Sequence, residues 1–239
     1  MKHYTLKDLL NSWHEKFKYK HYLGLAKDMT LHLDFSLKKQ KGGFKLASFS
    51  TASWPLFGAW YNICAKQTFY QKTGKIEQAG QQIKVSQNIP HDGVTQICNL
   101  MMEIACLVWA HVLLNIVYKF VDKAISLHGV PPFPIPCMCF VKAALAVEHN
   151  ISESNDARVF LLEEIIGEDE GCFRKYMNNV SAIPVSFTDL EDEEQAHFLV
   201  FAQHVQYFKT RKLAFISDYQ GKGDILPISC LQLTIINRW

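Results

Sequence analysis

The segment Asp218-Tyr219-Gln220-Gly221-Lys222-Gly223 constrains the fold and the chemistry of this chain more than any other. It follows the apolar run Leu213-Ala214-Phe215-Ile216, which is typical of a strand. On an extended backbone Asp218 and Gln220 point to the same face, because side chains alternate with period two. A carboxylate and an amide oxygen are hard ligands of the kind that Mg²⁺ takes. The segment therefore predicts a cation site where the chain turns through glycine.

Composition predicts a folded protein of mixed character. The chain has 239 residues, of which 49% are hydrophobic and 20% charged, so it has enough apolar material for a core. The net charge of +2 provides no strong field for nucleic acid, and we expect no nucleic-acid partner. The seven cysteines form no paired framework and no signal peptide precedes them, which favours a reducing, intracellular and cytoplasmic setting.

The first half of the chain is typical of an antiparallel sheet followed by a long helix. Residues 1–24 are expected to form a helical or irregular leader. Strand patterns then cover residues 30–37, 44–49 and 60–69, with a Gly42-Gly43 turn before the second. A helical pattern covers residues 93–124, with Asp92 as its cap. Its most apolar part, residues 104–121, is interpreted as a buried helix, and no membrane span is expected.

The second half mixes helices and strands. Four prolines between 131 and 136 suit a hinge between two lobes. Residues 139–150 are helix-like, residues 158–163 strand-like, and residues 188–209 helical with an acidic start that suits the helix dipole. His204 lies in an apolar helical pattern, where a histidine is usually a buried core residue.

Taken singly, the other candidate residues are weak signals. Lys66 lies in an apolar strand and must face water or a partner. Segment 173–179, Phe-Arg-Lys-Tyr-Met-Asn-Asn, can bring cations and donors to phosphate, and single-stranded nucleic acid would also suit it. Cys137 and Cys139 lack a second ligand pair at zinc spacing and are interpreted as structural.

The order of these motifs resembles the alpha-kinase family of atypical protein serine/threonine kinases, and in style its fungal members. The resemblance covers about residues 40 to 226 and depends most on the 173–179 and 218–223 segments. It implies a two-lobed α+β kinase-like fold. A twisted antiparallel sheet plus a helix would form the N-lobe, about 25–130 of a domain spanning 25–239. A mixed C-lobe, about 131–239, would lack its terminal zinc module.

The resemblance also implies MgATP bound between the lobes, an unidentified protein substrate and a role for each matching residue. Catalysis would rest on Lys66, which holds phosphate oxygens, and on Asp218, which with Gln220 ligates Mg²⁺. Glu103 would pair with Lys66, and Glu163 would meet the adenine. The nucleotide would further be contacted by Gly42, Gly43, Lys175 and Asn179.

Two departures from the family pattern bear on activity. Where the family carries an acid that takes part in catalysis, this chain reads Leu226-Pro227-Ile228, so Ile228 occupies the acid's position. The family's later zinc ligands are missing, which leaves His204 as a vestigial Zn²⁺ ligand without partners. We therefore expect a C-terminally shortened kinase domain with impaired turnover. The alternative is a catalytically dead pseudokinase that binds nucleotide or acts as a scaffold.

Overall fold

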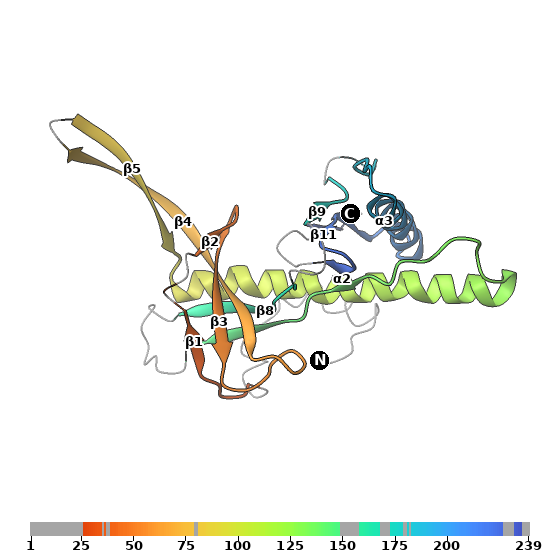
Figure 1. The fold of residues 1–239 in the computed structure, drawn as a ribbon, viewed down its shortest axis with the longest axis horizontal. Helices are drawn as coiled ribbons and strands as arrows, with labels where there is room; N and C mark the ends of the chain where they lie inside the picture. The colour runs from red at the N-terminus through yellow and green to blue at the C-terminus, as the bar shows by residue number, and fades with distance from the viewer. Residues whose placement is uncertain are drawn as a thin grey trace. The chain divides into compact units, whose positions relative to one another are not determined.

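The structure is a computed structural model that describes residues 26–34, 36, 39–78, 81–148, 158–167, 173–178, 181, 183–226 and 232–235 (Figure 1). The leader expected over residues 1–24 lies outside the described residues, as do Asn179 and Ile228. The described residues fall into two compact units. We call residues 26–102 with 142–165 the sheet unit, and residues 103–141 with 166–235 the C-terminal unit.

The sheet unit is an antiparallel sheet with the strand order β1-β3-β4-β8-β7. Strand β2 adds to β3, and β5 adds to β4. The bounds are β1 (Leu31–Leu33), β2 (Gln40–Lys41), β3 (Lys45–Ala52), β4 (Asn62–Gln78), β5 (Gln81–Pro90), β7 (Ala143–Val147) and β8 (Val159–Glu164). The three N-terminal strands and the strand near residue 160 are thus confirmed.

The described part of the segment 139–150, residues 139–148, is not helical, so the prediction of a helix there was wrong. These residues form β6 (Cys139–Phe140) and β7, and β7 pairs antiparallel with β8 from Ala143–Glu163 to Val147–Val159. The alanine-rich sequence suits a helix locally, but pairing with the buried strand β8 decides the conformation. The four prolines between residues 131 and 136, which were predicted to form a hinge, lie within the C-terminal unit.

One face of the sheet carries the apolar core of this unit. The buried cluster comprises Ala52, Ile63, Ala65, Phe160 and Leu162. Because side chains alternate along a strand, residues 64 and 66 of β4 point to the opposite face. The charged residue Lys66 is therefore kept away from the core by the same alternation that builds it.

Helix α2 (Gly93–His128) begins as predicted at Asp92, whose side chain accepts a hydrogen bond from the Thr95 amide at 2.9 Å. The helix completely buries Leu107, Leu113 and Val117. The helix is long and apolar enough to cross a membrane. Core helices of soluble proteins can have the same length and composition, so this is weak evidence for a membrane span. The buried glutamine Gln96 ties the helix start to β4.

The C-terminal unit contains the rest of α2, helix α3 (Leu190–Lys209) and short strands. Strand β9 (Arg174–Lys175) pairs antiparallel with β11 (Gln220–Gly221), and β12 (Ile225–Leu226) pairs parallel with β6. Strand β10 (Ala214–Asp218) pairs antiparallel with β13 (Gln232–Ile235). The helix predicted over residues 188–209 is confirmed, and its acidic first turn follows the cap residue Asp189.

Candidate functional site

In the sheet unit, Lys66 forms an ion pair with Glu163 across neighbouring strands. Lys66 Nζ lies 2.6 Å from Glu163 Oε2, and the two side chains are 15% and 3% exposed. The register explains the contact. Glu163 of β8 is paired with Cys64 of β4, so Lys66, two residues further, is its diagonal neighbour on the same face. The structure thus brings together two residues that the resemblance gave separate roles.

The carboxylate of Glu163 retains unused bonding capacity. Its other oxygen, Oε1, is buried and has no hydrogen-bond partner among the described residues. A buried acceptor without a donor is costly unless a donor arrives. This face can therefore accept a hydrogen bond from a bound molecule while Lys66 presents a positive charge.

The thiol of Cys64 and the amine of Lys45 lie on the same face of the sheet as Lys66 and Glu163. Burial raises the pKa of the Cys64 thiol above its usual value, and the nearby positive charge of Lys66 only partly offsets this. Cys64 is therefore a protonated packing residue and not a nucleophile. Lys45 is paired with Thr68 of β4, and it is 8% exposed.

The two glycines of the predicted phosphate loop form the tight turn between β2 and β3. The Gly42 amide donates to the Lys45 carbonyl oxygen at 2.8 Å. A Cβ at Gly43 would meet no atom within 4 Å, so the turn itself leaves room for a side chain there. Glu103, the other residue predicted to pair with Lys66, lies half-buried on α2 in the C-terminal unit.

In the C-terminal unit, Lys175 lies beside both Asp218 and Gln220, two residues that the sequence spacing places on one face. Gln220 of β11 is directly paired with Lys175 of β9. Lys175 Nζ lies 3.5 Å from Asp218 Oδ1, and the Asp218 side chain is 15% exposed. These three residues form what we call the carboxylate–amide cluster.

The carboxylate–amide cluster fits a magnesium ion by its donor set. Asp218 Oδ1 is buried and accepts no hydrogen bond from the described residues, although the amine of Lys175 lies 3.5 Å from it. This anionic oxygen could therefore ligate a cation while Lys175 remains beside it. Mg²⁺ is usually held by one or two carboxylates together with substrate phosphates and water. The amine of Lys175 adds a second positive group suited to phosphate oxygens.

The glycines after Gln220 are required by the fold. A Cβ on Gly221 would collide with the backbone oxygen of Ile225 and would lie 3.0 Å from the Leu226 side chain. Gly223 has a φ of 55°, the left-handed region that glycine adopts without cost. The turn closes through hydrogen bonds between Lys222 and Ile225 in both directions. It fixes the backbone that carries Gln220.

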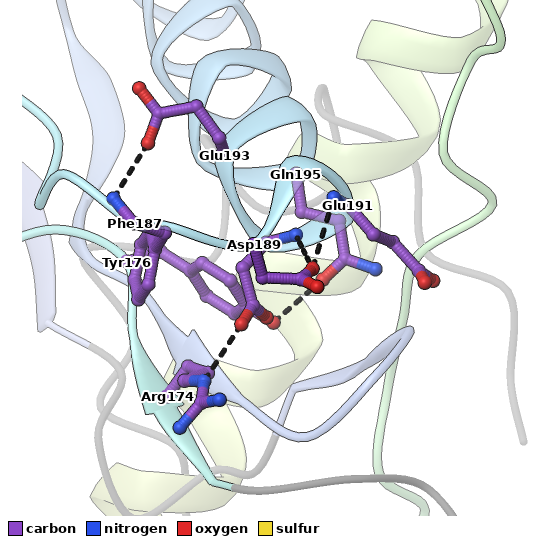
Figure 2. Close-up of polar contacts among 8 residues, drawn as sticks. Arg174, Tyr176, Phe187, Asp189, Glu191, Glu193 and Gln195 are labelled. Carbon is purple, nitrogen blue, oxygen red and sulfur yellow. Dashed lines mark hydrogen bonds and ion pairs between the residues drawn. The ribbon is translucent and has the colours of Figure 1, made fainter.

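The neighbouring Arg174 and Tyr176 have structural partners on α3. Arg174 Nε donates to Asp192 Oδ2 at 2.8 Å, and the Tyr176 hydroxyl donates to Gln195 Oε1 at 2.6 Å. Figure 2 shows Arg174 and Tyr176 beside the start of this helix. Burial raises the pKa of Tyr176 to about 12. Because side chains alternate along a strand, Arg174 and Tyr176 point to α3, whereas Lys175 points to the other side, where Asp218 lies. Within residues 174–176, Arg174 and Tyr176 therefore contact α3 whereas Lys175 contacts Asp218, a division that the sequence alone did not indicate.

Tyr219, which lies between Asp218 and Gln220 in sequence, connects the cluster to its surroundings by hydrogen bonds. Its backbone oxygen accepts hydrogen bonds from the amides of Tyr176 and Met177, and its hydroxyl accepts one from Gln206 at 2.9 Å. Burial raises the pKa of Tyr219 far above its usual value. Tyr219 thus joins the two segments of the cluster through its backbone oxygen, while its buried side chain fixes it to α3.

His204 is exposed on α3, so the interpretation as a core histidine was wrong. The helix turns a different stripe inward, because Gln203 and Gln206 are buried and bonded to β10. Among the described residues, no group of three His, Cys, Asp or Glu side chains could hold a metal ion. A zinc site is therefore not found in the described part of the chain.

Comparison with known proteins identifies one family. The model of the alpha-kinase family matches residues 64–227. Similar solved structures include the inactive alpha-kinase domain of myosin heavy chain kinase A in complex with ATP (16% identity, TM-score 0.51, 87% of this chain and 75% of that chain). The same domain in complex with AMPPCP gives 16% identity and a TM-score of 0.52 over 87% and 74%. No curated protein sequence matches this one. These structures confirm the predicted α+β kinase-like fold.

Proposed function

This chain belongs to the alpha-kinase family, and on that premise we propose that it binds MgATP and transfers the γ-phosphoryl group to a serine or threonine hydroxyl of a protein. The observation that carries the proposal is the carboxylate–amide cluster, in which a buried oxygen of Asp218 that accepts no hydrogen bond from the described residues lies 3.5 Å from the amine of Lys175. The similar alpha-kinase domain of myosin heavy chain kinase A has been solved in complex with ATP and with AMPPCP.

Lys66 would bind phosphate oxygens of the nucleotide. Its amine is held by Glu163 at 2.6 Å, so the charge has a fixed position before substrate arrives. Phosphoryl transfer requires little covalent help from the protein and depends on placed positive charge. A pre-positioned amine avoids the cost of ordering a flexible lysine at the moment of reaction.

Asp218 and Gln220 would ligate Mg²⁺, with Lys175 as a further phosphate contact. Magnesium, when bound, would neutralise charge on the phosphate oxygens. The role of Lys175 is then to hold the anionic end of the nucleotide in position. The unbonded Oε1 of Glu163 is the acceptor that a base amino group would need, in keeping with the adenine contact implied by the family.

Phosphotransfer is tested with purified chain, labelled ATP, Mg²⁺ and a general protein substrate such as myelin basic protein. We expect wild-type chain to label the substrate or itself, and Lys66→Ala to abolish labelling. Arg174→Ala is a matched control, because it removes a basic residue whose partner is structural. Loss of labelling in both variants, or in neither, would contradict the assigned role of Lys66.

A second candidate function is a pseudokinase that binds nucleotide without turnover. The observation that favours it is Ile228 in the position of the family's catalytic acid. Loss of such an acid usually costs orders of magnitude in rate. A MgATP-dependent rise in thermal stability without any phosphotransfer would favour the pseudokinase, whereas labelling that requires Lys66 would favour the kinase.

A further inference from the structure

The outer parts of β4 and β5 form a two-stranded ribbon that the proposed phosphotransfer does not use. β4 pairs with β3 over residues 62–68 and with β8 over 63–66. From Phe69–Pro90 to Gln78–Gln81 its described partner is β5 alone. Figure 1 shows this ribbon running out beyond the other strands of the sheet unit. We call residues 70–78 and 81–89 the β4–β5 ribbon.

The ribbon has one polar and one partly apolar face. Directly opposite residues share a face, so Tyr70 lies with Ile89, and Gly74 with Val85. Tyr70 and Val85 are 45% and 38% exposed. The other face carries only polar pairs in its described part, such as Thr73 with Ser86. An amphipathic ribbon of two strands is marginal in water on its own.

The outer edge of β5 is open to a further strand. Among the described strands, β5 pairs only with β4, so backbone groups along its other edge have no strand partner. Exposed edges are usually protected by several charges or an internal proline. Strand β5 has a single charged residue, Lys84, and its proline stands at the end, at position 90. It therefore lacks most of the features that prevent edge pairing.

We propose that two copies of this chain associate through β5, antiparallel, about a two-fold axis at Val85. The two ribbons would then form one four-stranded sheet. An antiparallel edge is complementary to a second copy of itself, and such isologous contacts close as dimers. The occupant of the edge is thus another molecule of the same chain.

The register follows from the residues of β5. If the two-fold axis lay between two residues of β5, the apolar face of one copy would continue into the polar face of the other. The axis therefore passes through a residue. An axis at Lys84 would place two like charges opposite each other, which destabilises a pair. An axis at Ser86 would bring Pro90, which has no N–H, into the ladder. An axis at Val85 pairs residues 81–89 throughout and sets Lys84 opposite Ser86.

Charge-swap variants of Val85 test the dimer. The oligomeric state of the full chain is measured by sedimentation velocity over a concentration series. We expect a wild-type dimer, while Val85→Lys and Val85→Glu each raise the dissociation constant at least about tenfold, because like charges meet at the axis. An equimolar mixture of the two variants should regain the dimer, since opposite charges then face each other.

The matched control is Thr73→Lys, which adds the same charge to the polar face of β4 and should leave the dimer unchanged. Far-UV circular dichroism checks that each variant is folded. Failure of the mixture to associate, an unchanged dimer in Val85→Lys, or a wild-type chain that stays monomeric up to about 100 µM would each overturn the proposal. None of these outcomes depends on phosphotransfer, so the dimer and the proposed activity are tested separately.

Discussion

Replacement of Lys66 by methionine should destabilise the sheet unit measurably. The change removes the ion-pair partner of Glu163 and keeps the length of the side chain. The Glu163 side chain is 3% exposed, whereas that of Lys66 is 15% exposed. Breaking a fully buried pair costs about 3–5 kcal/mol because a charge remains uncompensated. Partial exposure of Lys66 lowers the expected loss to about 2–4 kcal/mol.

The assay is urea unfolding followed by circular dichroism, with the free energy of unfolding obtained by linear extrapolation. The double variant Lys66→Met/Glu163→Gln should recover stability to within about 1 kcal/mol of wild type, because neither member of the pair is then charged. Lys142→Met is the control. Its partner Glu164 lies 3.9 Å away and the pair is 60% and 24% exposed, so we expect a loss below about 1 kcal/mol. Equal losses in Lys66→Met and Lys142→Met would refute the reasoning.

Three further predictions concern the C-terminal unit, and the first uses a glycine of the sheet unit as its control. Gly221→Ala should cost about 2–3 kcal/mol, because the new Cβ collides with the Ile225 backbone, whereas Gly43→Ala should change the free energy of unfolding by less than about 1 kcal/mol; urea unfolding of both checks this. Asp189→Ala should cost about 1 kcal/mol in the same assay, since it removes the cap of α3; an unchanged midpoint would contradict the cap assignment. Tyr176 has its pKa raised to about 12, chiefly by burial, so its contribution to stability is complete below the unfolded value of about 10 and is lost as pH rises from there through 12. Tyr176→Phe should flatten that alkaline loss, and a slope equal to wild type would argue against it.

The strands of the sheet and two residues of the carboxylate–amide cluster could be predicted from the sequence because they depend on local periodicity. Period-two alternation is enough to place Asp218 and Gln220 on one face and Lys66 away from the core. The pairing of Lys66 with Glu163 joins residues 97 positions apart in sequence. No local pattern specifies such a contact, and only the register of β4 against β8 creates it.

The errors have identifiable physical causes. Residues 143–147 have a helical composition but add to the sheet beside β8, so tertiary pairing overrides local preference. On α3, the buried stripe includes Gln195, Gln203 and Gln206, which are polar and hydrogen-bonded inside. A prediction based on hydrophobicity alone therefore placed His204 in the core, although it lies on the exposed side of the helix.

Nucleotide binding tests the central claim most directly. Isothermal titration of ATP is performed with and without Mg²⁺ on wild type and on Asp218→Asn, which keeps the shape of the side chain and removes its charge. We predict that Mg²⁺ strengthens ATP binding to wild type, and that Asp218→Asn loses this enhancement while its Mg²⁺-free binding is retained. Binding of MgATP to Asp218→Asn as tight as to wild type, or no binding to wild type at millimolar nucleotide, would contradict the account.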